Sequence, residues 1–437
     1  MYQNYRNLLN DFISKKSIST DANFASEIQK TADWLSETFK SHGFTSEVVQ
    51  GFGNPLVYAS YVVDPSLPST LVYGHYDVQP AKKEDGWDAD PFTIVEKDGK
   101  LIARGIVDNK GQVLIHTVAV FNLIDAKKLT KNVIFLIEGD EETGNTGVGK
   151  WLRENHSKLN INEVLISDGE MPYKPMITAS FRGTFNSTVK VKTADNNLHS
   201  GLYGGAVPSA VEELATFVSK LHNDNYETPV VGFYDGQTTP SVDEKKLSAQ
   251  LDIEREKVLA HTGIKKFFTD ESNGFSLKTG FVTMVTTSGF KGGYIDSGYS
   301  NIVPSTAEAR FNFRIAAESD PVKIWKSFKD FARKEIPDYV EVTFSEPESI
   351  VHPIKVDVTS PLHQKTIDLL EEVYGDKVLI DYCGATIPFV VDIKEVLNVD
   401  PLLVSLANDD CNMHGVNENY DIELIKKGLE FSQKYFS

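Results

Sequence analysis

The sequence predicts an α/β fold, in which a mostly parallel sheet is flanked by helices and a smaller α+β domain is inserted into the chain. Three observations support this prediction. Short hydrophobic runs at 71–73, 132–137, 163–167 and 401–406 are typical of parallel strands that are buried on both faces. Segments with helical periodicity separate these runs. Between residues 184 and 350 the runs give way to alternating strands, which are typical of a separate layer.

The amino-terminal part is expected to contain helices, strands and a hairpin. Hydrophobic residues at spacings of three and four predict helical structure from residue 4 to about residue 42, with a helix start at Thr20 or Asp21. Asp98 and Gly99 form a turn signal within a hairpin at 94–102. The other elements expected here are strands at 45–49 and 56–63 and a helix at 112–123.

The inserted domain is predicted to span residues 184–350, and residues 1–183 and 351–437 are predicted to form the other domain. From Phe185 the sequence alternates hydrophobic and polar residues, whereas the stretch from 223 to about 273 is charged and shows no clear core pattern. The elements expected in this part are a helix at 208–221, strands at 280–286, 306–315 and 340–344, and a helix at 321–335. The final helices are expected at 361–374 and 424–436.

The composition excludes several classes of function. A chain of 437 residues with 41% hydrophobic residues can form two or more folded domains. A formal net charge of -18, with dispersed lysines, argues against a nucleic-acid or anionic-membrane partner, because both would repel it. Two cysteines are too few for a disulfide framework. With neither a signal peptide nor a membrane-spanning stretch in view, we expect a cytoplasmic protein.

Acidic and imidazole side chains follow the predicted parallel strands. Because the carboxyl ends of parallel strands share one edge of a sheet, we expect these side chains to meet in one crevice. They are His75, Asp77, Glu141, Glu142 and Asp168. A His-x-Asp pair by itself is more often a surface turn, and a Glu-Glu pair is more often a solvated loop. The position directly after a buried strand favours the functional interpretation of the two glutamates.

These residue types predict a site for divalent cations. Histidine and carboxylate ligands without cysteine suit zinc, cobalt or manganese. Two cations about 3.5 Å apart need a shared carboxylate, and together they activate a water molecule between them. Asp108 is the best candidate for that bridge because it comes from a separate loop at the same edge, although an aspartate before a helix is often its N-cap. Of two adjacent glutamates, one can bind a cation while the other accepts a proton.

Six blocks of sequence contain these residues or other polar groups in a fixed order. They are Gly74-His-Tyr-Asp-Val-Gln-Pro80, Arg104-Gly-Ile-Val-Asp-Asn-Lys-Gly111, Glu138-Gly-Asp-Glu-Glu-Thr-Gly144, Ser167-Asp-Gly169, Leu198-His-Ser-Gly-Leu-Tyr-Gly-Gly205 and Asp409-Asp-Cys-Asn-Met-His414. In this order they resemble the co-catalytic metallopeptidases that include aminoacylase, glutamate carboxypeptidase, succinyl-diaminopimelate desuccinylase and the carnosine and cytosolic non-specific dipeptidases. The resemblance covers almost the whole chain and is closest to the dipeptidases.

The resemblance implies a fold like that of the di-zinc exopeptidases and a role for each residue of the site. The implied metal ligands are His75 and Asp168 for one cation, Glu142 and His414 for the other, and Asp108 for both. Asp77 would hydrogen-bond to His75 and fix its tautomer. Glu141 would be the general base. A cis peptide bond between Asp108 and Asn109 is also implied. The cations would be two Zn²⁺, with Mn²⁺ or Co²⁺ as alternatives.

The resemblance further implies substrate-binding residues and a homodimer formed by the inserted domains. His199 would stabilise the oxyanion in the site of the partner chain, Asn301 would bind near the substrate carbonyl, and Arg314 would bind its free carboxylate. Thr386 matches a hydroxyl position that contacts substrate. For these four residues an ordinary role in a loop or strand is the alternative. Cys411, three residues before His414, is expected to be a packed thiol, with a thiolate ligand as the alternative.

We therefore predict a metal-dependent hydrolase of dipeptides or similar small peptides. An N-acyl-amino-acid deacylase or desuccinylase is the alternative within the same chemistry, since only the substrate pocket separates the two. A non-catalytic binding protein on the same fold would be expected to have lost a ligand residue, and none is missing. A two-metal phosphoesterase is disfavoured because the sequence shows no basic phosphate-binding loop.

Overall fold

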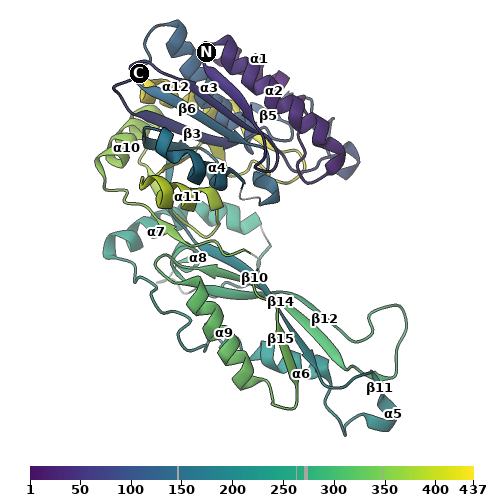
Figure 1. Cartoon of the computed structure of the whole chain (residues 1–437). Helices are drawn as coiled ribbons and strands as arrows, with labels where there is room; N and C mark the ends of the chain where they lie inside the picture. The colour runs from purple at the N-terminus through teal and green to yellow at the C-terminus, as the bar shows by residue number, and fades with distance from the viewer. Residues whose placement is uncertain (145–146, 262, 270–273, 348) are drawn as a thin grey trace.

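The fold was analysed in a computed structural model, which describes residues 1–144, 147–261, 263–269, 274–347 and 349–437. Its elements form a large sheet with helices on both faces and a smaller antiparallel layer (Figure 1). None of the described helices is long and apolar enough to cross a membrane.

The large sheet has nine strands in the order β1-β2-β6-β3-β7-β18-β9-β16, and β17 also pairs with β9. The central strands β6, β3, β7 and β18 run parallel, and antiparallel pairs lie toward the edges. The α/β fold is therefore confirmed. The strands are β1 (Thr45–Val49), β2 (Leu56–Tyr61), β3 (Ser69–His75), β6 (Asn132–Glu138), β7 (Ile161–Ile166), β9 (Met176–Phe181), β16 (Ile354–Lys355), β17 (Leu379–Cys383) and β18 (Leu402–Ser405).

Helices cover both faces of this sheet because its strands are hydrophobic on both sides. In β3, Val72 packs into the core under one set of helices, whereas Leu71 and Tyr73 pack into the core on the other face. The first set consists of α1 (Tyr2–Ile13), α2 (Ala25–Ser41), α3 (Lys110–Asp125), α10 (Pro361–Tyr374) and α12 (Ile422–Phe436). On the other face lie α4 (Gly147–Asn155) and α11 (Pro388–Leu397). Because the strands are held between these helices, the carboxyl ends of the strands have fixed positions at the edge of the sheet.

A four-stranded antiparallel sheet in the order β12-β14-β10-β15 forms the smaller layer. Its core is rich in aromatic residues, including Phe185, Phe311 and Phe328. The elements are β10 (Gly183–Lys192), β12 (Met284–Gly292), β14 (Thr306–Ile315), β15 (Glu341–Phe344), α6 (Ala210–Ser219) and α9 (Pro321–Glu335). At its tip lie β11 (Leu198–His199), α5 (Ser200–Tyr203) and β13 (Ile302–Val303) (Figure 1).

Two features of the segment between β10 and β12 differ from the sequence prediction. The charged stretch after residue 223 contains α7 (Val242–His261), which is followed by α8 (Phe275–Phe281), and both helices pack against β17 of the large sheet. The strand predicted at 280–286 begins only at Met284, because α8 continues to Phe281. Gly280 allows α8 to approach β17 closely, since a Cβ atom at this position would lie 2.2 Å from the main-chain carbonyl oxygen of Tyr382.

Short elements complete the chain. The predicted hairpin is present as β4 and β5, and β5 also pairs with a third strand near the carboxyl terminus. The short elements are β4 (Val95–Lys97), β5 (Lys100–Ile102), β8 (Glu170–Met171), β19 (Ala407–Asn408), β20 (Asn419–Asp421), η1 (Ala22–Phe24), η2 (Lys83–Asp85), η3 (Glu141–Thr143) and η4 (His156–Lys158).

Candidate metal centre

Three neighbouring parallel strands bring polar side chains to one edge of the large sheet. β3 ends at His75, and Asp168 follows β7 after one intervening residue. β6 ends at Glu138, and the 3₁₀ turn that follows begins with Glu141 and Glu142. Because β6, β3 and β7 lie side by side and run in the same direction, these side chains reach the same edge.

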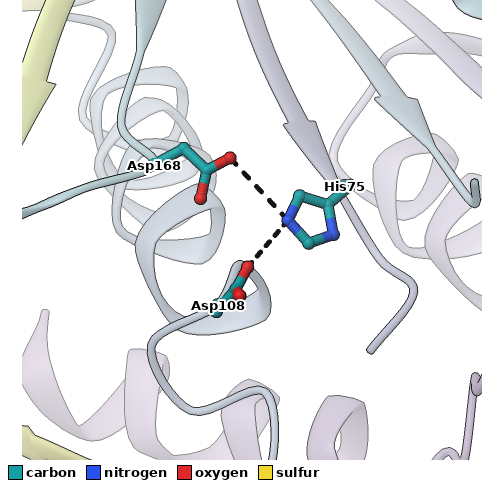
Figure 2. A group of neighbouring side chains, drawn as sticks. All are labelled: His75, Asp108 and Asp168. Carbon is teal, nitrogen blue, oxygen red and sulfur yellow. Dashed lines mark ion pairs between the residues drawn. The ribbon is translucent and has the colours of Figure 1, made fainter. Parts of the chain in front are cut away.

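The first group of possible ligands consists of His75, Asp108 and Asp168. Nε2 of His75 lies 2.9 Å from Oδ1 of Asp108 and 3.8 Å from Oδ2 of Asp168. Figure 2 shows the imidazole between the two carboxylates. Asp108 comes from the loop before α3, whose N-cap is Asn109, so Asp108 is not the N-cap residue.

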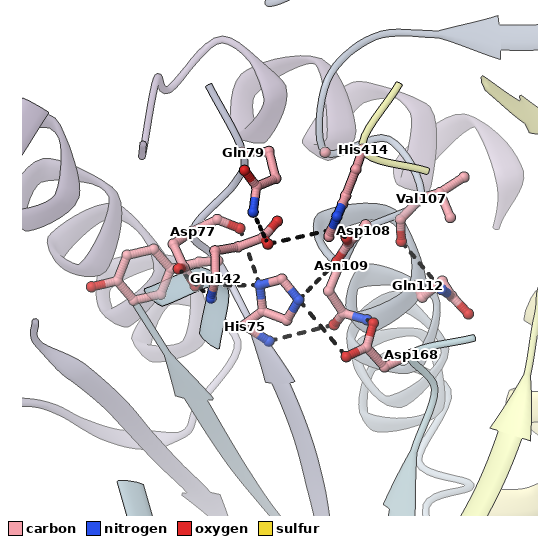
Figure 3. A network of polar contacts seen from close by, with 12 residues as sticks. His75, Asp77, Gln79, Val107, Asp108, Asn109, Gln112, Glu142, Asp168 and His414 are labelled. Atoms are coloured by element: carbon pink, nitrogen blue, oxygen red, sulfur yellow. Dashed lines mark hydrogen bonds and ion pairs between the residues drawn. The ribbon is translucent and has the colours of Figure 1, made fainter. Parts of the chain in front are cut away.

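The second group consists of Asp108, Glu142 and His414. Nε2 of His414 lies 2.7 Å from Oδ2 of Asp108 and 3.3 Å from Oε2 of Glu142. The two carboxylate oxygens of Asp108 thus face different groups (Figure 3). The structure brings together all five ligands implied by the sequence, as two groups that share Asp108.

The orientation of His75 fits a bound cation. Its Nδ1 lies 3.0 Å from the main-chain carbonyl of Asp77, which can only accept a hydrogen bond, so Nδ1 carries the proton. Nε2 faces the carboxylates of Asp108 and Asp168, and this buried atom makes no hydrogen bond. Burial lowers the pKa of His75, but the carboxylates of Asp108, Asp77 and Asp168 together outweigh it and raise this pKa well above its usual range. The carboxylates therefore favour a positive charge at this position, either a proton on Nε2 or a bound cation. Nitrogen and oxygen ligands of this kind suit a borderline or hard divalent cation.

Asp77 supports both sides of the cluster. Its main-chain carbonyl accepts from His75, while its carboxylate Oδ1 lies 3.3 Å from the same nitrogen. Its Oδ2 accepts a hydrogen bond from the backbone N–H of Glu142 at 3.1 Å. Asp77 therefore fixes the ring of one expected ligand and the backbone of another.

The carboxylates of the cluster have strongly shifted pKa values. Burial raises the pKa of Asp168 well above its usual range and that of Glu142 to about 7. Burial acts in the same direction on Asp108, but the hydrogen bonds and charges of His414 and His75 together outweigh it and lower the pKa of Asp108. Burial also raises the pKa of Glu141. Such a concentration of buried acidic groups is typical of a functional site.

Two neutral side chains complete the cluster and were not singled out from the sequence. Nδ2 of Asn109 donates to the carbonyl of Ser167 at 2.7 Å and to Oδ1 of Asp168 at 3.0 Å. Nε2 of Gln79 donates to Oε2 of Glu142 at 2.6 Å. Each amide orients an expected ligand, as outer groups do in metal sites. Their positions inside ligand-bearing blocks were the only sequence signal for them. The Asp108–Asn109 peptide bond is cis, as the resemblance implies.

His199 and Asn301 lie far from this cluster, at the tip of the smaller layer (Figure 1). His199 belongs to β11 and pairs with Ile302, and the carbonyl of Asn301 accepts from the N–H of Ser200 at 3.0 Å. Nδ1 of His199 accepts a hydrogen bond from the N–H of Gly201. The structure thus brings these two predicted residues together, but does not bring them to the metal ligands of the same chain.

Arg314 and Thr386 meet where the two layers join. Nη1 of Arg314 lies 3.1 Å from Oγ1 of Thr386, whose hydroxyl donates to the main-chain carbonyl of Arg182. Arg182, which sequence reasoning missed, donates from Nε to the carbonyl of Gly384 and from Nη1 to that of Val282. Among the described residues neither guanidinium pairs with an acidic side chain, and burial together with Arg314 lowers the pKa of Arg182 to about 10. This juxtaposition suits an anionic ligand.

Cys411 is buried outside both ligand groups. Its Sγ donates a hydrogen bond to Oε1 of Glu170 at 2.9 Å, and burial raises the pKa of the thiol. A thiol with a raised pKa is a poor metal ligand, because only the thiolate binds.

The chain is similar to known proteins along most of its length. A sequence profile described as Peptidase family M20/M25/M40 matches residues 71–437. The Beta-Ala-His dipeptidase of Mus musculus is 27% identical over 380 residues, covering 83% of this chain and 75% of that protein. A Cys-Gly metallodipeptidase of Schizosaccharomyces pombe is 26% identical over 454 residues, covering 97% and 93%. The structure of an M20 family metallo-carboxypeptidase from Sulfolobus solfataricus matches with a TM-score of 0.85 at 26% identity, covering 99% and 98%.

Fold, ligand cluster and comparisons together define a metal-dependent peptidase. The chain belongs to Peptidase family M20/M25/M40, because the family profile covers most of its length. The resemblance inferred from the six sequence blocks is thereby confirmed, and so is the prediction of a metallopeptidase.

Proposed function

We propose that this protein is a dipeptidase that hydrolyses its substrate at a site with two divalent cations. The observation that carries the proposal is the sharing of Asp108 by two ligand groups, with His75 and Asp168 on one side and Glu142 and His414 on the other. When bound, such cations polarise a substrate carbonyl and lower the pKa of a water molecule. We propose Zn²⁺ as the cation, with Mn²⁺ or Co²⁺ as alternatives, on the basis of the ligand types.

Glu141 is the proposed general base. It lies in the same 3₁₀ turn as Glu142, and burial raises its pKa, which brings a carboxylate closer to the basicity that proton transfer at neutral pH requires. Glu141 accepts a proton from the water that attacks the peptide carbonyl, and returns it to the departing amine nitrogen. Asp77 holds His75 and the backbone of Glu142 in place during the reaction.

A dipeptide is the proposed substrate. Relatives along most of this chain are named as Beta-Ala-His and Cys-Gly dipeptidases. Arg314, Thr386 and Arg182 form a cationic cluster that suits the carboxylate at the end of a short peptide. A carboxylate bound there would place the adjacent peptide bond at a fixed position, so the length of the substrate would be limited by the site.

A homodimer would complete this site. His199 and Asn301 lie at the tip of the smaller layer, where large hydrophobic side chains are exposed. These exposed side chains, on α5 or between β12 and β13, are Leu202, Tyr203, Tyr294, Ile295 and Tyr299. Such a cluster is typical of an interaction surface. Pairing of two tips would carry His199 to the partner's site, where its ring would donate to the developing oxyanion and Asn301 would bind near the carbonyl.

The division of labour between the layers follows from this arrangement. Residues 1–183 and 351–437 are proposed as the catalytic domain, and residues 184–350 as a dimerisation and lid domain. The second part begins with β10 and ends after β15, although α7 and α8 within it pack against β17. A cytoplasmic location is proposed because two cysteines in 437 residues are too few for a disulfide framework.

A substrate panel with defined metal content tests this function. The purified protein, stripped by a chelator and reloaded with Zn²⁺, Mn²⁺ or Co²⁺, is assayed on free dipeptides and on N-acyl amino acids. We expect loss of activity on stripping, its return on reloading, and a higher kcat/KM for dipeptides. Activity restricted to N-acyl amino acids would identify a deacylase instead. Full activity after complete removal of metal would contradict the proposed site.

A further inference from the structure

A buried ion pair lies beneath the ligand cluster and has no part in the proposed chemistry. Nη1 of Arg104 lies 2.8 Å from Oε2 of Glu418, and the two residues are 3% and 0% exposed. Arg104 lies between β5 and α3, whereas Glu418 directly precedes β20. The pair therefore joins the loop that carries Asp108 to the loop that carries His414.

Glu418 holds the Asp108 loop through its backbone. Its Oε2 accepts from the N–H of Gly105 at 2.9 Å, and its Oε1 accepts from the N–H groups of Val107 at 2.8 Å and Asp108 at 3.1 Å. Together with Arg104 these donors satisfy the carboxylate fully. A buried carboxylate with this many donors fixes the path of the chain up to the shared ligand.

Arg104 holds the His414 loop from the other side. Its Nη2 donates to the main-chain carbonyls of His414 at 3.2 Å and Gly415 at 3.1 Å. The His414 backbone has a φ of 60°, in the left-handed region that non-glycine residues seldom adopt. Its side chain is 53% exposed, so packing does little to fix the ring. The position of this ligand therefore depends on its backbone, which Arg104 anchors.

The other ligand group has a different anchor. His75 is fully buried at the end of β3, and Asn109 bonds to Asp168 and to the carbonyl of Ser167. These contacts do not involve Arg104 or Glu418. Arg104 thus supports only the His414 side, whereas Glu418 also holds the backbone of Asp108, which both groups share.

From this arrangement we infer that Arg104, which Glu418 holds in place, is a positioning residue that sets the affinity for one of the two cations, the one expected at Asp108, Glu142 and His414. The inference rests on the proposed two-cation function. Loss of the ion pair leaves the His75 and Asp168 side in place but releases the backbone of His414. The protein then keeps one cation and binds the second weakly.

Cobalt binding tests this inference without an activity assay. Metal-free protein is titrated with Co²⁺ at pH 7.5, and bound cobalt is followed by equilibrium dialysis and by its visible absorption. We expect two ions per chain in the unmodified protein. In Arg104→Met the first ion should retain its affinity within about threefold, and the second should bind about 10–100-fold more weakly. Glu418→Gln should also weaken the second ion, with a smaller effect on the first, because Glu418 additionally holds the backbone of the shared residue Asp108. The double variant should weaken the second ion little further than Arg104→Met, because the ion pair acts as a unit.

Two further variants separate positioning from general loss of structure. Arg104→Lys keeps the buried charge but loses the guanidinium fork, so the second ion should again bind weakly. Lys110→Met is the matched control, because Lys110 is equally buried and donates to the carbonyls of Phe12 and Lys15 instead of the His414 loop. It should bind both ions normally. Thermal unfolding confirms that each variant is folded at the titration temperature.

Several outcomes would overturn the inference. They are unchanged binding of both ions in Arg104→Met, equal weakening of both ions, or the same loss of the second ion in Lys110→Met. A failure of the proposed function would look different, since the unmodified protein would then bind one cobalt ion or none.

Discussion

Oδ2 of Asp108 lies 2.7 Å from Nε2 of His414, although 306 positions separate the two residues in the chain. Without a cation this contact is a charge-assisted hydrogen bond, and with a cation both atoms become ligands. The contact therefore couples metal binding to protonation.

Metal binding is predicted to release protons at pH 8. The hydrogen bond to Asp108 raises the pKa of His414 to about 9 in the metal-free protein, so the imidazole is mostly protonated at this pH. The proton must leave before Nε2 can bind a cation, so binding should strengthen as the pH rises towards 9. Isothermal titration in buffers of different ionisation enthalpy measures the release, which we expect to be about one proton from this residue. His414→Ala should release fewer protons, and equal release in both proteins would contradict the assignment.

Replacement of the proposed base should separate chemistry from metal binding. Glu141→Gln should keep both cations, and its kcat should fall about 10²–10⁴-fold because general base catalysis is lost. Metal content and kcat are measured on the same preparation. Glu142→Gln serves as the contrast, since it should lose affinity for one cation. If Glu141→Gln retained the activity of the unmodified protein, another group would have to accept the proton.

Two inactive variants should complement each other if His199 acts across a dimer. In a mixed dimer, the chain with His199→Ala keeps Glu141 and receives His199 from a partner with Glu141→Gln. Each mixed dimer then has one intact site out of two, so purified mixed dimers should recover about half of the activity of the unmodified protein. The two chains are co-expressed with different tags and assayed after tandem purification. No recovery in verified mixed dimers would show that His199 does not serve the partner's site.

Arg314 is predicted to select substrates with a free carboxylate. Arg314→Met should lower kcat/KM for a dipeptide about 10–100-fold, the equivalent of one lost hydrogen bond to a charged group. The corresponding dipeptide amide should be affected much less, because it lacks the carboxylate. Arg310→Met is the matched control, since Arg310 lies on the same strand but is exposed and pairs with Glu308. Equal losses on both substrates would exclude this role.

His116 is predicted to make the fold sensitive to acid. Burial lowers its pKa to about 3, and its ring contacts the hydroxyls of Ser167 and Ser432. The unfolded chain binds a proton near pH 6.5 but the folded chain does not, so stability is lost as the pH falls from about 6.5 towards 3, by at most about 1.4 kcal/mol per pH unit. The free energy of unfolding of metal-free protein is measured by urea denaturation at several pH values across this range. It should depend less steeply on pH in His116→Gln than in the unmodified protein. His156 is exposed, so His156→Gln is the control and should leave the pH dependence of the free energy of unfolding unchanged.

The packed position of His116 could be predicted from sequence, since it lies within a hydrophobic helical segment and is fully buried in α3. The same holds for His75 and Asp168, which follow buried strands, and for the boundaries of β1 and α9, which match the predicted ranges. Residues that are close in sequence encode these features through hydrophobic periodicity. α7 escaped prediction because its charged sequence has no strong periodic pattern.

By itself the sequence determined which strands are buried, where their polar ends emerge and which residue types gather there, because hydrophobic and polar order along the chain is a local property. Only the tertiary structure decided that Arg182 and Arg314 meet at Thr386, and that Arg104 meets Glu418. These contacts join segments up to hundreds of positions apart. The packing of the layers determines which of these residues meet. The hydrophobic periodicity of the sequence does not indicate which distant residues will be in contact.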